Sequence, residues 1–118
     1  MTTAILELTQ EQIDANRRKV IRALKRSKHQ CFGTLFEDRA VCAVGCAARA
    51  LLGIQNESQA EAYGQSRIYG EIERLLGYID VGGNSLRWLW RLNDGHRALT
   101  LPEIGAECER RWFPGDAS

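Results

Sequence analysis

The first third of the chain has the hydrophobic periodicity of a helix. At about 100° per residue, one face of this segment is apolar and comprises Ile13, Val20, Ile21 and Leu24. Thr9 and Gln12 have the spacing of a capping box, in which each side chain bonds the other residue's backbone N–H. We therefore predict an amphipathic helix that begins at this box and ends at about Lys28.

Two short apolar runs follow, at residues 31–36 and 40–42, and the polar residues 37–39 lie between them. This pattern predicts a small β-hairpin. Residues 43–52 are rich in Ala, Gly and Cys, whose small side chains allow neighbouring backbones to approach closely. We predict that this segment is a helix at the centre of the core and that Gly53 ends it.

The second half of the chain predicts further helices. Residues 55–65 are the most polar stretch and have no strong period, which predicts a loop or a frayed helical turn. Helices are predicted at 66–76, from 84 or 85 to about 92, and at 100–112. In the middle one, Leu86, Leu89, Trp90 and Asn93 lie on a roughly common side, so Trp90 is assigned to the core and Trp88 to the surface.

The stretch LNDGHRALTLPEI, residues 92–104, contains the residue types of a binding site. However, Thr100 and Glu103 have capping-box spacing, and Pro102 lies in the first helical turn, where a missing N–H costs nothing. An EF-hand alignment lacks two oxygen ligands and places Arg97 where the loop needs glycine. We therefore predict a turn and a helix start, and no calcium site.

Length and composition predict one soluble domain. The chain has 118 residues, of which 44% are hydrophobic and 26% charged. We expect a single globular domain over 1–118 with its core at about 8–112. The sequence has no apolar run that could span a membrane and no secretory signal at its start, so we expect a cytoplasmic protein. The predicted fold is mainly α (α+β): a compact bundle of four or five helices with one small hairpin.

The four cysteines are interpreted as reduced thiols that fill the core. Cys42 and Cys46 are spaced as a ligand pair on a helix, but no second close pair completes a zinc site. Neither His29 nor His96 has a spacing to a cysteine that predicts a catalytic pair. We therefore predict no metal, no cofactor and no enzymatic activity, and an enzyme of unrecognised type that uses a Cys or His is the least favoured hypothesis.

Basic residues are concentrated near the N-terminus. The net charge is +1, but residues 1–30 hold seven Lys or Arg and three Asp or Glu. Five of these cations fall on the polar face of the first helix: Arg18, Lys19, Arg22, Lys25 and Arg26. Such a face is typical of a solvated helix, and the functional alternative is binding of nucleic acid phosphates.

A second candidate surface lies in the predicted helix near residue 88. Trp88, Arg87 and Arg91 are proposed as a protein-binding patch, because Trp and Arg are enriched at interface hot spots. A helix-turn-helix is not predicted, because the chain ends before a recognition helix could follow residues 100–112.

The order of these features resembles a family of small uncharacterised proteins of bacteriophages and bacterial genomes. The resemblance rests on a central Cys-x-x-Gly helix entry, matched by residues 42–45, and on a later Leu-Asn-Asp segment and Glu-Ile helix, matched by residues 92–94 and 103–104. It covers about residues 17–112, and the chain departs from the pattern at Leu101-Pro102 and with Gly105 in place of Ala. It implies a small host-interaction or regulatory protein and carries no catalytic residues.

The leading hypothesis from the sequence is a non-enzymatic binding protein whose partner is another protein or a second copy of itself. The alternative is sequence-independent nucleic acid binding through the basic face of the first helix.

Overall fold

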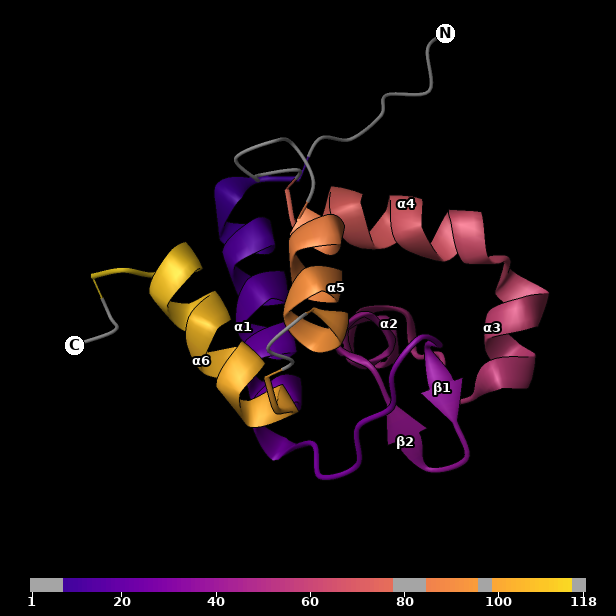
Figure 1. Ribbon diagram of the computed structural model, residues 1–118. Coiled ribbons are helices and arrows are strands. Elements are labelled where there is room, and N and C mark those ends of the chain that lie inside the picture. The colour runs from indigo at the N-terminus through magenta and orange to yellow at the C-terminus, as the bar shows by residue number, and fades with distance from the viewer. Residues whose placement is uncertain (1–7, 78–84, 96–98, 116–118) are drawn as a thin grey trace, which may run out of the picture.

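The computed structural model is mainly helical, with one two-stranded hairpin, as predicted (Figure 1). It describes residues 8–77, 85–95 and 99–115, with the side chains of 85–87 left out. The described elements are α1 (Gln10–Arg26), β1 (Phe36–Glu37), β2 (Ala40–Val41), α2 (Ala43–Leu52), α3 (Glu57–Tyr63), α4 (Gln65–Leu75), α5 (Ser85–Asp94) and α6 (Leu101–Trp112).

Both predicted capping boxes are present. Thr9 Oγ1 accepts from the backbone N–H of Gln12, and Gln12 Oε1 accepts from that of Thr9, with N···O distances of 3.1 and 2.9 Å. Thr100 and Glu103 form the same pair of bonds at the start of α6, with Pro102 in the first turn. The last part of the stretch that carries the residue types of a binding site therefore begins a helix, as predicted, and its residues 96–98 lie outside the described residues.

Helix α2 lies at the centre of the core, as predicted, and contacts α1, α4, α5 and β2. Residues 43–48 are all buried. Helices α1, α5 and α6 lie beside one another, whereas α3 and α4 form the opposite side of the molecule (Figure 1). The predicted apolar face of α1 faces α2 and α6: Val20, Ile21 and Leu24 are buried, and Ile13 is half-buried.

Two predictions from the sequence are wrong in detail. The stretch predicted as a loop or frayed turn contains helix α3, because Asn56 caps it through Gln59 N and Ala60 is buried against the core. The hairpin is shorter than predicted: Phe36 pairs with Val41 and Glu37 with Ala40.

None of the helices that the structure describes has the length and apolar character of a membrane-spanning segment.

The assignment of the two α5 tryptophans is also wrong. Trp90 is 56% exposed, whereas Trp88 packs against the core and its ring centroid lies 6.2 Å from that of Trp112. Both side chains are about 100° around the helix from the buried Leu89, in opposite directions. Periodicity alone therefore cannot predict which of the two side chains is the more buried. The position of α6 decides which one is covered.

Candidate functional site

Asn93 is the centre of a buried polar junction between α5, the start of α2 and the loop before β1. Its side chain is fully buried. Its Oδ1 accepts from Ala43 N at 3.0 Å and from Gln30 Nε2 at 2.9 Å, and its Nδ2 donates to the Cys31 carbonyl at 3.0 Å and to Asp94 Oδ1. An amide has two acceptor sites and two donors, so Asn93 is saturated.

The Cys42-x-x-Gly45 segment has a structural role beside this junction. The Cys42 sulfur accepts from Gly45 N at 3.3 Å and so caps α2. A Cβ at Gly45 would lie 2.2 Å from the carbonyl oxygen of Leu35, so only glycine allows this close backbone contact. Two of the motifs on which the family resemblance rests, residues 42–45 and 92–94, thus join α2, α5 and the loop before β1.

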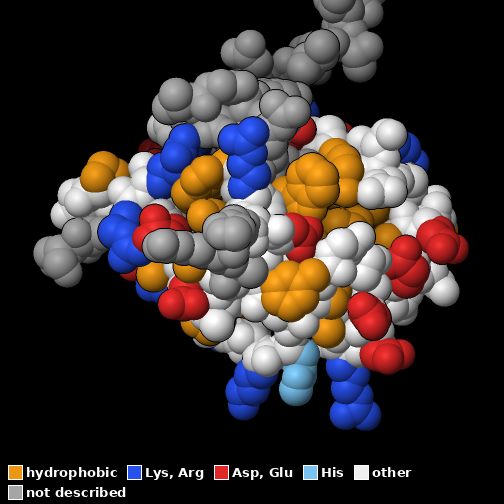
Figure 2. Space-filling view, in the orientation of Figure 1, with side chains coloured by type: hydrophobic (Ala, Val, Ile, Leu, Met, Phe, Trp, Pro, Cys, Tyr) orange, Lys and Arg blue, Asp and Glu red, His pale blue; other side chains and the backbone are white. Residues whose placement is uncertain are grey.

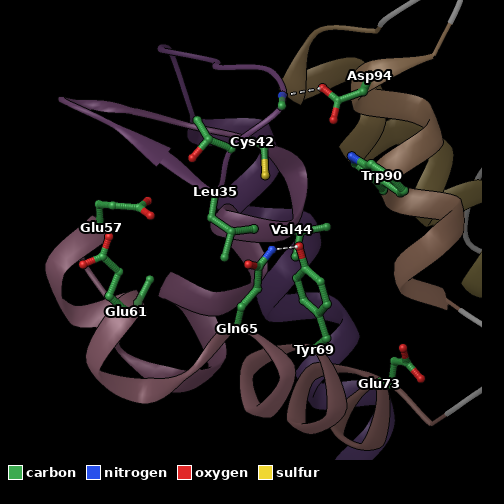
Figure 3. A pocket seen from close by; sticks show the side chains of 13 residues that line it. Leu35, Cys42, Val44, Glu57, Glu61, Gln65, Tyr69, Glu73, Trp90 and Asp94 are labelled. Atoms are coloured by element: carbon green, nitrogen blue, oxygen red, sulfur yellow. Dashed lines mark hydrogen bonds between the residues drawn. The ribbon is translucent and has the colours of Figure 1, made fainter.

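An open cavity of about 560 Å³ lies next to the junction, between α2, α3, α4, α5 and residues 33–35 (Figure 3). We call it the acidic groove. Part of its wall is apolar and includes Leu35, Val44 and Ala60. Four carboxylates line it: Glu57, Glu61, Glu73 and Asp94. Among the residues whose side chains the structure describes, none that lines the groove is Lys or Arg. Figure 2 shows hydrophobic side chains exposed beside the acidic ones that gather over α3.

Two aromatic side chains enter the acidic groove from different helices. Trp90 enters from α5 and Tyr69 from α4, and the Tyr69 hydroxyl bonds Gln65 Nε2 at 2.6 Å (Figure 3). An exposed large aromatic side chain in a concave site is the usual anchor of a binding surface.

The thiols of Cys42 and Cys31 are not activated nucleophiles. Burial raises the pKa of Cys42, which lines the groove, to about 12. The pKa of Cys31 is also raised, first by burial and then by the charges of Glu37, Asp94 and Glu57. Reactive cysteines have lowered pKa values, whereas burial and, after it, the local negative charge favour the neutral thiol here.

All four cysteines are buried and free, which confirms their assignment to the core. Burial raises the pKa of Cys46 and Cys108 as well. His29 is exposed, and His96 lies outside the described residues. Among the residues that the structure describes, no three His, Cys, Asp or Glu side chains are grouped in a way that could hold a metal ion.

The structure describes part of the proposed protein-binding patch. Trp88 is half-buried beneath the Arg111 guanidinium, whose carbon lies 4.5 Å from the Trp88 ring centroid. Arg91 is exposed on α5, and the side chain of Arg87 lies outside the described part of the structure. The exposed tryptophan of this helix is Trp90, which faces the acidic groove.

The basic face of α1 is exposed at all five predicted positions, Arg18, Lys19, Arg22, Lys25 and Arg26. Two of these side chains already contact the C-terminal part of the chain: Lys25 Nζ lies 2.9 Å from Glu109 Oε1, and the Arg18 guanidinium lies 3.9 Å from the Phe113 ring centroid. The neighbouring Arg17 is buried and donates two bonds to the Leu76 carbonyl at the end of α4. Part of the N-terminal positive charge is therefore structural.

The sequence did not identify the acidic groove. Its carboxylates come from three separate helices, and no spacing along the chain links Glu57 or Glu61 to Asp94. The available signals were the polar stretch at residues 55–65 and the high aromatic content of α5.

No protein-family model matches the chain, and no curated protein or solved structure is significantly similar to it. The resemblance to small phage and bacterial proteins therefore stays an expectation from its motifs.

Proposed function

We propose that the protein is a non-enzymatic binding protein and that its acidic groove receives a basic, amphipathic segment of a partner protein. One observation carries the proposal: four carboxylates and the exposed Trp90 surround a partly apolar cavity, and no described side chain in its lining is a cation. The partner segment would supply Lys or Arg to the carboxylates and one large apolar side chain to the cavity.

The physical properties of the groove favour this occupant. A cavity of about 560 Å³ lies within the range of small binding sites, and a partner side chain placed there would lose its contact with water. Trp90 and Tyr69 offer ring faces to a cation as well as apolar contact. The negative charge of the groove accelerates the encounter with a basic partner and disfavours the binding of acidic ones.

The test is selection of peptides from a random 12-residue phage library on the immobilised protein, followed by affinity measurement with the enriched peptides. We expect enrichment of sequences that combine Lys or Arg with an aromatic or large aliphatic residue. Trp90→Ala should weaken their binding about tenfold or more, as is usual for a central anchor. No enrichment, or enrichment of acidic peptides, would refute the proposal.

A matched pair of charge variants distinguishes binding in the groove from general electrostatic attraction to the protein surface. Glu61→Gln/Glu73→Gln removes two charges from the groove, and Glu11→Gln/Glu107→Gln removes two charges elsewhere on the surface. Binding should weaken in the first variant and stay nearly constant in the second. If the enriched peptides resemble α1, sedimentation of the protein alone will show whether the partner is a second copy of the chain.

Nucleic acid binding by the basic face of α1 is the second candidate, supported by the exposure of all five cations. It predicts an affinity for a 20-base-pair DNA duplex that falls steeply with salt and is reduced in Arg22→Glu/Arg26→Glu. The acidic groove is preferred because Arg18 and Lys25 are already engaged by the C-terminal part of the chain.

A further inference from the structure

A second cavity, of about 350 Å³, lies at the end of α1, between this helix, the hairpin and α2. We call it the basic hollow. Its apolar wall includes Val41 and Cys46, and five side chains that are or can become cationic line it: Arg26, Lys28, His29, Arg39 and Arg49. Within the described part of the chain, no Asp or Glu lines it. Lys, Arg and His side chains gather at the lower edge of the view in Figure 2.

These cations lack the carboxylate partners that other cations of this protein have. Lys25, Arg74 and Arg110 each form an ion pair with a glutamate. Within the described part of the chain, no ion pair is formed by the Lys and Arg residues of the hollow. The nearest acids in the sequence, Glu37 and Asp38, line a neighbouring cavity that shares His29 and Arg39 with the hollow, but neither acid forms an ion pair with Arg39.

Arg49 has a donor that the protein does not satisfy. One terminal nitrogen donates to the Gln55 carbonyl at 3.2 Å, and the guanidinium lies 5.6 Å from the Phe36 ring centroid. The Nε–H is buried and has no hydrogen-bond acceptor. A buried donor without a partner is costly, so an acceptor placed in the hollow would gain more from this arginine than from an exposed one.

Interaction with helix dipoles explains only part of the cluster. Arg26 and Arg49 lie in the last turns of α1 and α2, where positive charge is favourable. Lys28 directly follows the C-cap of α1 and shares in this effect, whereas Arg39 lies in the hairpin turn, outside both helices. Their convergence on one concave site needs a different reason.

We propose that the basic hollow binds a phosphate group, a site separate from the acidic groove. Guanidinium groups match phosphate oxygens in geometry and bind them with charge-assisted hydrogen bonds. Arg49 would turn its unsatisfied N–H towards one oxygen, and Arg26, Lys28 and Arg39 would neutralise the charge at the rim. The phosphate belongs either to a small phosphate ester or to the terminal phosphate of a nucleic acid strand.

The test is titration of the ¹⁵N-labelled protein with inorganic pyrophosphate at low ionic strength, followed by NMR. We expect saturable shifts at the amides of residues 26–29, 39 and 49. Lys28→Gln/Arg39→Gln should weaken binding about tenfold or more, since it removes two charge-assisted contacts. The control Lys19→Gln/Arg22→Gln removes the same charge from the exposed face of α1 and should change binding by less than about twofold.

Two single-stranded oligonucleotides, with and without a 5′-phosphate, identify the source. If the phosphorylated strand binds more tightly than both the unphosphorylated strand and pyrophosphate, the hollow is assigned to a nucleic acid end; if it does not, the hollow is assigned to a small ester. The proposal is overturned if pyrophosphate gives no saturable shift, or if the control variant loses as much affinity as Lys28→Gln/Arg39→Gln.

Discussion

The polar junction at Asn93 and the acidic groove are adjacent, yet their polar groups are used in opposite ways. Asn93 is fully buried, and each of its hydrogen-bonding positions is occupied by another part of the chain. The next residue, Asp94, accepts from Gly33 N with one oxygen and also lines the groove. A polar side chain that the protein has saturated stabilises the fold, whereas carboxylates around an open cavity are available to a partner.

The strongest test of this comparison is Asn93→Ala. The substitution leaves the Ala43 N–H and the Cys31 carbonyl without their side-chain partner in a buried place. We expect the free energy of unfolding to fall by about 3–5 kcal/mol, because buried groups without partners are costly. Urea denaturation measures the loss. A fall below about 1 kcal/mol would show that the junction is not a main source of stability.

Gly45→Ala tests the backbone contact at the same junction. The new methyl group would overlap the Leu35 carbonyl, so we expect a loss of about 2–3 kcal/mol in stability. Gly70→Ala is the matched control, because Gly70 lies in the exposed part of α4 and nothing surrounds the added methyl group. That variant should gain about 0.5–1 kcal/mol from its higher helix propensity. Equal changes in stability in the two variants would contradict the close contact between Gly45 and the Leu35 carbonyl.

The two α5 tryptophans give the smallest and most specific contrast. Trp88→Ala removes packing against Trp112 and should cost about 1–2 kcal/mol, less than for a fully buried ring. Trp90→Ala should change stability by less than about 0.5 kcal/mol, since its side chain is largely exposed. Thermal or urea denaturation of both variants measures the contrast. If Trp90→Ala is the more destabilised variant, Trp90 belongs to the core and not to the groove.

The parts of the fold that could be predicted are those marked by short, local sequence motifs. The two capping boxes marked the starts of α1 and α6, and Gly53, with a φ of 71°, marked the end of α2. The interpretation of the cysteines as core residues also needed only their type and the soluble composition. These features depend on residues within a few positions of one another, so a single sequence contains the necessary information.

The remaining features depend on contacts between distant segments. Helix α3 has a single buried residue, Ala60, so it has almost no periodicity to detect. Trp88 and Trp90 are distinguished only by the placement of α6. The acidic groove and the basic hollow are each lined by side chains from several elements. No local pattern indicates that Glu61 and Trp90, or Arg39 and Arg49, will line the same cavity.

The bonds of Asn93 also make one backbone amide a reporter of helix docking. Ala43 N–H is the first amide of α2, and Asn93 Oδ1, 50 residues further along the chain, is its acceptor. First-turn amides have no partner within their own helix, so this proton exchanges with solvent unless α5 is in place. Its hydrogen-exchange rate therefore measures how often α5 separates from α2, and exchange at this one amide follows the opening of that side of the protein in solution.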